Sequence, residues 1–334
     1  MRPSAIASMR LLCILCATTA CSALKNTALV FVKPHASTDT VAAFVRSHLM
    51  AAGLSIVDEG VKTAEEIDSR KLIDQHYGSL AKLAMDVPPS ELALTPDALK
   101  AFESTYSMPW ATAVMSTMTN TEALTSLGVD GLSLETMWRG GLQLKLAPGT
   151  YISRIDKAGD ALFTVNGFYP AMRQAFVTPG AMVRYLVCEW DEAELSWQRF
   201  RRDVIGATDP KAASVGSCRN VMLSMWQELG LSEAPGMPNN VVHASAGPLE
   251  GLKERAVWCG ADVAADALAQ QLFQAGLTRA TLDMWLSDNP KVTLGGETDK
   301  VFDLTEEMGA EAVVQLVRAQ MGGAYEYAAA QAVF

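Results

Sequence analysis

One histidine stands in a setting that favours chemistry over packing. The stretch 239–245 reads Asn-Asn-Val-Val-His-Ala-Ser, so His243 closes a short apolar segment between polar neighbours. A histidine with a reference pKa of about 6.5 is largely neutral at pH 7, so one ring nitrogen can act as a nucleophile while the other donates to a carboxylate. Glu250 and Glu254 follow along the chain, and we expect Glu254 to be that carboxylate. An isolated histidine of this kind more often has a structural role. Whether His243 has a chemical role therefore depends on residues elsewhere in the chain.

The signatures of several other enzyme classes are missing. The sequence contains no G-x-x-x-x-G-K-[ST], no G-x-G-x-x-G after a strand, no H-E-x-x-H and no G-x-S-x-G. These motifs would mark a Walker-type ATPase, a Rossmann dehydrogenase, a zinc protease and an α/β hydrolase. With 4 histidines in 334 residues, a metal site built from several histidines is also not expected.

Further motifs follow one another along the chain. They are Lys33-Pro34, His76-Tyr77, Phe168-Tyr169-Pro170, the block 202–210 that reads Arg-Asp-Val-Ile-Gly-Ala-Thr-Asp-Pro, Gly216-Ser217-Cys218-Arg219, and Asn240-Val241-Val242-His243-Ala244-Ser245. In type and order these motifs resemble those of the nucleoside diphosphate kinase family. The resemblance covers about 26–80 and 167–258, and its most specific parts are the His243 motif and the Gly-x-Thr-Asp-Pro block.

The resemblance implies a role for each matching residue. His243 would be a phosphorylated nucleophile, with Glu254 and Ser245 as its hydrogen-bond partners. Tyr77 would sit beside the histidine. The residues implied to bind nucleotide are Lys33 at the sugar hydroxyl and phosphate, Arg202, Thr208 and Arg219 at the phosphates, Asn240 at the ribose, and Phe168 stacked on the base.

The activity implied is transfer of the γ-phosphate of a nucleoside triphosphate to a nucleoside diphosphate. The donor would be ATP with Mg²⁺, and no side chain is expected to ligate the metal. Phosphoryl transfer needs positioning and cationic stabilisation, which two arginines and a lysine can supply without a P-loop. An alternative is a catalytically weak or inactive nucleotide-binding or interaction module of the same fold.

Three positions depart from the family's pattern. The family usually has Asp where His35 stands, an acidic residue where Ala246 stands, and Arg where Asn166 stands. A missing charged hydrogen bond is worth about 1.5–3 kcal/mol, which weakens an enzyme without abolishing it.

The surrounding elements can be predicted from hydrophobic periodicity. The run 28–32 suits a central strand stopped by Pro34, and a helix capped by Ser37 or Thr38 should follow and end at Gly53. A second strand is expected over 54–61 and a helix over 64–84. The resemblance implies an α+β fold of ferredoxin-like type, an antiparallel sheet with packed helices.

The expected domain is interrupted and then extended. A kinase-like domain over 26–258 would hold an insertion at about 82–166, which prolines divide into short helical pieces such as 97–107 and 121–126. Strand signals follow at 162–165 and 182–189, and helical patterns at 193–203 and 218–229. The rest, 259–334, is rich in Ala, Gln and Leu and predicts a helical C-terminal extension. Because the insertion is large, the family's hexamer is doubtful, and a homo-oligomer remains an open expectation.

The first 23 residues have the three-part layout of a cleavable leader. A basic start, a short apolar centre and small residues at the exit favour a signal peptide, with a plastid or mitochondrial transit peptide and a retained helix as alternatives. Three of the cysteines would leave with it, and Cys188, Cys218 and Cys259 have neither disulfide-framework nor zinc spacing, so small buried roles are expected.

Composition limits the partners. The charge is −10 and the pI about 5.0, which argues against a protein that coats nucleic acid or an anionic membrane. No later stretch is long and apolar enough to cross a bilayer.

Overall fold

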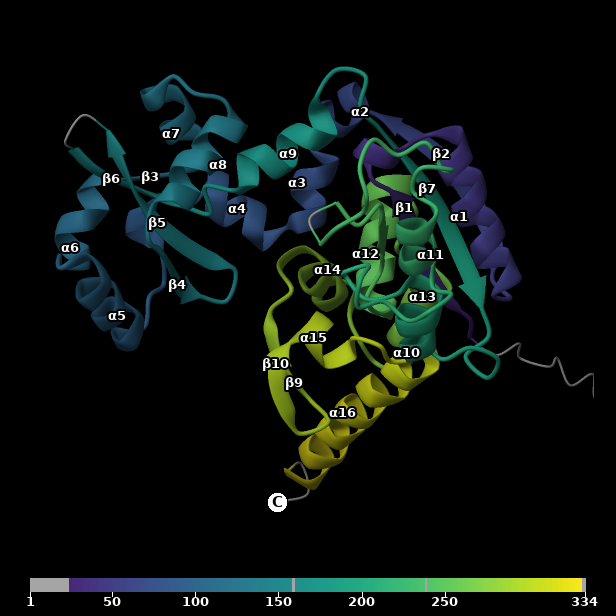
Figure 1. Ribbon diagram of the computed structural model, residues 1–334. Helices are drawn as coiled ribbons and strands as arrows, with labels where there is room; N and C mark the ends of the chain where they lie inside the picture. The colour runs from purple at the N-terminus through teal and green to yellow at the C-terminus, as the bar shows by residue number, and fades with distance from the viewer. Residues whose placement is uncertain (1–23, 158–159, 238, 332–334) are drawn as a thin grey trace, which may run out of the picture.

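The computed structural model describes residues 24–157, 160–237 and 239–331 (Figure 1). The predicted leader, 1–23, lies outside these residues. None of the described helices is long and apolar enough to cross a membrane.

The central sheet has four antiparallel strands in the order β2-β7-β1-β8. The strands are β1 (Asn26–Val32), β2 (Ser55–Thr63), β7 (Met182–Trp190) and β8 (Val242–Ala244). Helices alternate with these strands along the chain, so the predicted α+β fold of ferredoxin-like type is confirmed.

Alternate residues of β1 face two different helical layers. Val30 and Val32 pack with Val45 of α1 (Asp39–Ala51), whereas Phe31 packs on the other face. There it meets Trp258 of α12 (Pro248–Cys259). Because side chains alternate across a strand, the apolar run 28–32 in β1 is what a sheet covered on both faces requires.

The predicted start and end of α1 are confirmed. The Thr38 side chain accepts a hydrogen bond from the backbone N–H of Val41 at 3.2 Å, which caps the helix. Gly53 has φ of 89°, a left-handed conformation that glycine adopts freely, and the chain turns there into β2.

The helix expected over 64–84 is instead three short helices. They are α2 (Ala64–Ser69), α3 (Leu72–Tyr77) and α4 (Ser79–Met85). The breaks fall at Lys71, with φ of 52°, and at Gly78, with φ of 50°, and left-handed residues interrupt a right-handed helix. Because of these breaks, α3 and α4 run in different directions and the chain enters the inserted segment (Figure 1).

The inserted segment forms a lobe of its own, joined to the central sheet through α4 and α9 (Figure 1). Its helical pieces and strands are α5 (Pro96–Tyr106), α6 (Trp110–Ala113), α7 (Asn120–Leu127), α8 (Gly131–Gly140), β3 (Thr117–Met118), β4 (Gln143–Ala147), β5 (Thr150–Lys157) and β6 (Asp160–Val165), followed by α9 (Tyr169–Val177). The sheet order is β3-β6-β5-β4. The expectation of a helical insertion is therefore wrong in part, because Pro148 and Gly149 make a hairpin turn between β4 and β5 rather than a helix boundary.

The helical predictions between β7 and β8 are confirmed only in part. The segment 193–203 holds α10 (Trp197–Arg199) and a π-helix, η4 (Phe200–Ile205), and α11 (Cys218–Ser224) is shorter than expected. The remaining short helices are η1 (Pro34–Ala36), η2 (Pro89–Glu91) and η3 (Val114–Ser116). Cys188 and Cys218 are buried as expected, and Cys259 is half-buried.

The C-terminal extension packs against α12. It comprises α13 (Ala267–Gln274), α14 (Arg279–Asp288), β9 (Lys291–Leu294), β10 (Glu297–Lys300), α15 (Val301–Thr305) and α16 (Ala310–Gln331). Leu249 and Leu252 of α12 belong to its apolar core. The extension is mostly helical as expected, but Gly295 and Gly296 turn β9 into β10 and make an unpredicted hairpin.

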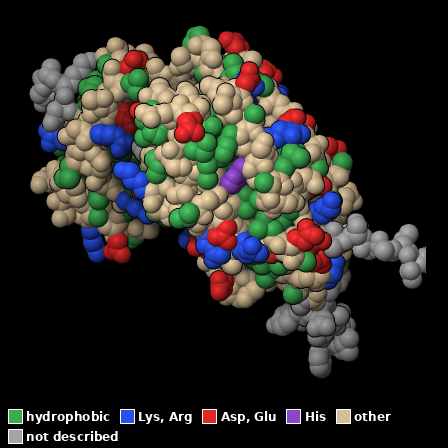
Figure 2. Space-filling model, turned by 45° about the vertical axis from the view of Figure 1, so that its right-hand side comes forward, with side chains coloured by type: hydrophobic (Ala, Val, Ile, Leu, Met, Phe, Trp, Pro, Cys, Tyr) green, Lys and Arg blue, Asp and Glu red, His purple; other side chains and the backbone are tan. Residues whose placement is uncertain are grey.

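Charged side chains of both signs are interspersed on the face that Figure 2 shows, without a continuous basic surface. This face does not offer the accumulated cations that a polyanion would need.

Asn166 holds the junction between the inserted lobe and α9, which explains its presence where the family has Arg. It is fully buried and has φ of 49°. Its side chain accepts from the N–H of Tyr151 at 2.8 Å and donates to the carbonyl of Gly149 at 2.8 Å. The residue therefore clamps the β4–β5 hairpin.

We expect Asn166→Ala to lower the free energy of unfolding by about 2–4 kcal/mol, because two half-buried partners lose their hydrogen bonds to a buried side chain and alanine disfavours a left-handed φ. Asn166→Gly should cost about 1 kcal/mol less, since glycine keeps the backbone conformation. Urea unfolding of both variants measures the difference. Equal stability of wild type and Asn166→Ala would contradict this role.

Candidate active site

A cavity of about 530 Å³ opens beside β8. It is lined by cations, carboxylates and the backbone of the 206–214 loop, among them Lys33, Arg201, Arg202, Thr208, Arg219, Asn240, His243, Glu250 and Glu307. Segments far apart in the sequence thus meet at one edge of the sheet.

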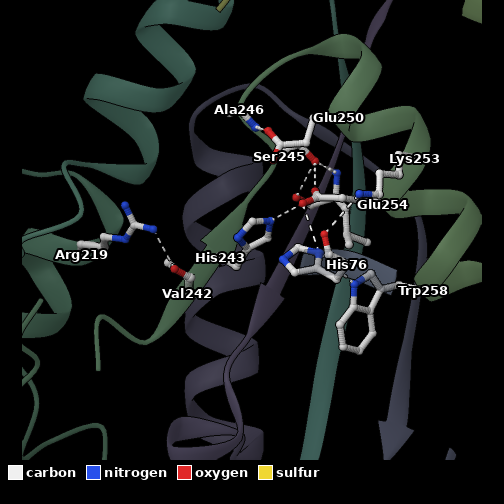
Figure 3. A network of polar contacts seen from close by, with 11 residues as sticks. His76, Arg219, Val242, His243, Ser245, Ala246, Glu250, Lys253, Glu254 and Trp258 are labelled. Carbon is white, nitrogen blue, oxygen red and sulfur yellow. Dashed lines mark hydrogen bonds and ion pairs between the residues drawn. The ribbon is translucent and has the colours of Figure 1, made fainter. Parts of the chain in front are cut away.

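His243 lies on β8 and is held from two sides. Its Nε2 lies 2.7 Å from Oε1 of Glu254, and its ring stacks on Phe31 with centroids 4.7 Å apart (Figure 3). With Nε2–H donating to the carboxylate, the other nitrogen, Nδ1, keeps its lone pair and points away from Glu254 (Figure 3). No residue in the described part of the chain is hydrogen-bonded to Nδ1, so it is available as a nucleophile.

Glu254 is buried on α12 and is fixed by Ser245 as well. The Ser245 hydroxyl donates to Oε2 of Glu254 at 2.6 Å, while the N–H of Leu29 on β1 donates to the same hydroxyl at 2.9 Å. Burial raises the pKa of Glu254, and the Ser245 hydrogen bond opposes that rise by stabilising the carboxylate. These hydrogen bonds, together with the one between His243 and Glu254, connect β1, β8 and α12.

His76, at the end of α3, completes the buried cluster. Its Nδ1 lies 3.3 Å from both Glu254 Oε1 and Trp258 Nε1, and its ring meets that of His243 edge-on at 4.7 Å. Burial lowers the pKa of His76 to about 3, so the ring is neutral. In the neutral ring, Nδ1 of His76 either accepts a hydrogen bond from Trp258 or donates one to Glu254, but it cannot do both at once.

Burial also lowers the pKa of His243, to about 4. Glu250 opposes this shift, while the positive charges of Lys33, Arg219 and Arg201 add to it. His243 is therefore uncharged at neutral pH, as a nucleophile must be.

A strained turn presents this histidine. Val241 has φ of 70°, rare for a β-branched residue, and the N–H of Val242 donates to the carbonyl of Asn240 at 2.8 Å, which closes a γ-turn. The Val241 carbonyl accepts from the N–H of Lys33 at 2.8 Å. Such strain amounts to about 1–3 kcal/mol and is concentrated at functional sites.

Lys33 and Arg219 bring positive charge that no carboxylate neutralises within ion-pair distance among the described residues. Burial lowers the pKa of Lys33 to about 8, with a further contribution from Arg219. Arg219 donates to the carbonyls of Gly206 at 2.7 Å and Val242 at 2.8 Å, and burial lowers its pKa to about 10. Two uncompensated cations beside a nucleophile suit an anionic ligand.

Arg201 and Arg202 both line the cavity but have different partners. Arg202 is 68% exposed and its guanidinium donates to both carboxylate oxygens of Asp203, at 2.8 and 2.9 Å. Arg201, to which the resemblance gives no role, is bonded to Glu306 and Glu307 of the C-terminal extension. The π-helix η4, with its wider turn, carries both arginines.

Asn240 and Thr208 lie together in the cavity. The Asn240 amide donates to the carbonyl of Thr208 at 3.0 Å. Its other side-chain atom, Oδ1, is buried without a partner, and so is Nε of Arg219. Buried polar atoms without partners are uncommon, and both of these belong to residues that line the cavity.

Phe168 and Tyr77 are not among the residues that line this cavity. Phe168 packs its ring against Trp138 and Tyr151 of the inserted lobe, with centroids 5.5 and 6.3 Å apart. Tyr77 contacts the His76 ring at 5.0 Å, and burial raises its pKa to about 12. The structure thus brings together the implied phosphate and ribose residues, with the implied base-stacking residue elsewhere.

The departures at His35 and Ala246 have different consequences. His35 is exposed on η1. The Ala246 N–H donates to Glu250 at 2.7 Å, and the Ala246 carbonyl accepts from Glu307 at 2.9 Å. Burial raises the pKa of Glu250 to about 7.

The sequence pattern gave no role to two carboxylates of the cavity, Glu250 and Glu307. Glu307 lies too far along the chain from His243 for a local motif to indicate it.

Metal ligands are present in two kinds. His76, His243 and Glu254 bring three ligand atoms within 4.8 Å of one another, a set that suits zinc better than magnesium. Hydrogen bonds already use His243 Nε2, Glu254 Oε1 and His76 Nδ1. Glu250 offers carboxylate oxygens, the ligands that magnesium prefers. One of them, Oε2, accepts a hydrogen bond from the N–H of Ala246.

No protein-family profile matches the sequence, and no curated protein matches it either. Among solved structures, a nucleoside diphosphate kinase from Encephalitozoon cuniculi is 16% identical with a TM-score of 0.34, over 71% of this chain and 90% of that one. An NDP kinase from Pyrobaculum aerophilum is 16% identical with a TM-score of 0.31, over 70% and 96%. A nucleoside-diphosphate kinase from Borrelia burgdorferi, with bound vanadate and ADP, is 16% identical with a TM-score of 0.32, over 70% and 87%. The function proposed below depends on the residues of the cavity rather than on these overlaps.

The geometry predicts the protonation of His243 directly. Because its pKa is about 4, the ring should stay neutral from pH 5.5 to 8, with the proton on Nε2. Imidazole ¹⁵N NMR should show that single tautomer. Glu254→Ala should mix the tautomers, whereas Glu250→Gln, which contacts no ring atom, should not; titration of His243 near pH 6.5 would contradict the assignment.

Proposed function

We propose that this protein is a phosphotransferase of nucleoside diphosphate kinase type, which moves the γ-phosphate of a nucleoside triphosphate to a nucleoside diphosphate through a phosphohistidine at His243. The observation that carries the proposal is a neutral histidine held at Nε2 by Glu254, with Nδ1 free beside a cavity lined by Lys33 and Arg219. No P-loop is needed, because these cations can hold the phosphates.

The reaction has two symmetrical halves. The Nδ1 lone pair attacks the γ-phosphorus, a P–N bond forms, and the bond to the β-phosphate oxygen breaks as the nucleoside diphosphate leaves with the electron pair. A second diphosphate then attacks the phosphorus and the P–N bond breaks. The ring becomes positive in the intermediate, and the Glu254 carboxylate, 2.7 Å from Nε2, stabilises that charge.

The other cavity residues match parts of a nucleotide. Lys33 and Arg219 would bind the phosphates. The Nε of Arg219 has no hydrogen-bond partner among the described residues, so this donor is not yet used. The unpartnered Oδ1 of Asn240 can accept from a ribose hydroxyl. Thr208 would contact a phosphate beside them. Arg202 would have to release Asp203 to do the same.

Magnesium would enter bound to the nucleotide's phosphate oxygens, and the Glu250 carboxylate is the cavity group that would hold it. The ion supplies screening of the phosphate charge. The residues of the cavity do the rest: they bind the phosphates, orient the nucleophile and keep its proton on Nε2.

A second candidate is a nucleotide-binding module with little or no turnover. Two observations favour it: Phe168 lies against the inserted lobe, and Arg202 is paired with Asp203. This candidate predicts nucleotide binding without phosphate on His243.

We expect γ-labelled ATP to leave an acid-labile, base-stable phosphate on the wild type and none on His243→Ala. That stability distinguishes a phosphoramidate from a serine or threonine phosphoester, and the variant assigns it to His243. His35→Ala removes an exposed histidine outside the cavity and should label normally. Equal labelling of His243→Ala would sink the kinase proposal, and ADP binding without any labelling would favour the second candidate.

The lowered pKa of Lys33 predicts that nucleotide binding depends on pH. Below its pKa of about 8 the side chain is charged and attracts phosphate; above it the charge is lost in the free protein. Affinity for ADP, measured by calorimetry, should therefore fall by about tenfold per pH unit above pH 8 if binding requires the charge. Lys33→Arg, which stays charged, should show a flat profile, and parallel profiles would contradict the assignment.

A further inference from the structure

The C-terminal extension places one carboxylate in the cavity wall, Glu307, and a second beside it, Glu306, which shares the partner Arg201. Glu306 and Glu307, which we call the acidic pair, directly follow α15. Arg201 Nη1 donates to Glu307 Oε1 at 3.1 Å and also to Glu306. Glu307 is itself part of the cavity wall, so an element outside the resemblance contributes to the candidate active site.

The acidic pair is held in place by the loop that follows His243. Glu307 has φ of 59°, a left-handed conformation that non-glycine residues seldom adopt. Its N–H donates to the Ala246 carbonyl at 2.9 Å. Gly247 is close by, and a Cβ there would lie 2.7 Å from the Thr305 carbonyl oxygen. Farther on, the N–H of Ala310 donates to Oδ1 of Asn26 on β1 at 2.8 Å. The strained backbone is therefore fixed on both sides.

Arg201 faces the place where phosphates would bind. Its charge contributes to lowering the pKa of both His243 and Arg219, so it lies near the nucleophile and the principal phosphate ligand. Arg202, in contrast, turns to Asp203 on its own helix. A guanidinium binds phosphate as readily as carboxylate and with the same forked geometry, so the acidic pair and a polyphosphate would compete for Arg201.

We propose that Arg201 is a phosphate-binding residue and that the acidic pair of the C-terminal extension is an autoinhibitory contact that occupies it until a nucleoside polyphosphate displaces the carboxylates. The polyphosphate as ligand rests on the proposed function. The negative charges of Glu307 in the cavity wall and of Glu306 beside it would also repel a polyphosphate, in addition to withholding Arg201.

The exposure of these side chains suits a contact that opens. Arg201 is 32% exposed, Glu306 44% and Glu307 39%. Ion pairs this accessible to water are weak and are screened by salt, so a ligand of several negative charges can displace them. The contact tunes affinity rather than closing the site.

The test measures ADP binding by calorimetry, with and without Mg²⁺, at low and high salt. Glu306→Gln with Glu307→Gln keeps size and hydrogen bonding while removing charge, and we expect it to bind ADP about 3- to 10-fold more tightly at low salt. The gain should shrink in high salt, and it should be smaller when Arg201→Gln is added, because only the relief of repulsion then remains. Arg201→Gln alone should weaken binding, and Glu311→Gln, a carboxylate of α16 outside the cavity wall, should change nothing.

Unchanged or weaker ADP binding by the double variant would overturn the inference. Loss of affinity only with Mg²⁺ would also overturn it, since Glu307 would then be holding the cation. Inorganic tripolyphosphate separates this inference from the proposed function: if wild type binds no ADP but the double variant still binds tripolyphosphate more tightly than wild type, the kinase proposal fails and the acidic pair is supported. Matching melting temperatures check that the variants fold.

Discussion

The hydrogen bond between His243 Nε2 and Glu254 Oε1 is the interaction on which the site depends. It joins a three-residue strand, β8, to α12, and through Ser245 it also reaches the backbone of β1. A hydrogen bond to a buried carboxylate is worth about 1.5–3 kcal/mol, and leaving the carboxylate unpaired would be costlier still. The fold and the nucleophile are therefore stabilised by the same contact, and the tautomer follows from it.

The second constraint concerns charge: the protein as a whole carries −10, yet the cavity has to hold several cations. Lys33 and Arg219 are half-buried, burial lowers the pKa of both, and no carboxylate of the described residues lies within ion-pair distance of either. Arg219 is oriented by backbone carbonyls, which position a cation without neutralising it. Arg201 and Arg202 have carboxylate partners instead. The site thus holds two cations ready for an anion and two that must first release a neighbour.

Much of this could be predicted from the sequence, where the signal is local. β1 and α1 follow from a compact apolar run, a capping Thr38 and a left-handed Gly53. His243, Glu254 and Ser245 meet because one strand–turn–helix segment carries all three. The helix over 64–84 could not be placed correctly, because its break at Lys71 is a left-handed non-glycine residue that no propensity indicates.

Other features depend on contacts between distant segments. Phe168 matches the expected motif, yet Trp138 and Tyr151 of the inserted lobe determine where its ring lies. The division of roles between Arg201 and Arg202 depends on a π-helix and on Glu307, which is a hundred or so residues away along the chain. Packing of this kind has no period or spacing that a sequence pattern can detect.

The C-terminal extension and the inserted lobe are related to the cavity in different ways. The C-terminal extension buries its apolar core against Leu249 and Leu252, on the same helix that carries Glu254, so it is anchored to α12 itself. The inserted lobe, in contrast, draws Phe168 away from the cavity wall. The residues that line the cavity include no Phe, Tyr or Trp that could stack on a base. Under the proposed function, we therefore expect the site to distinguish nucleotides by the number and charge of their phosphates more than by the base.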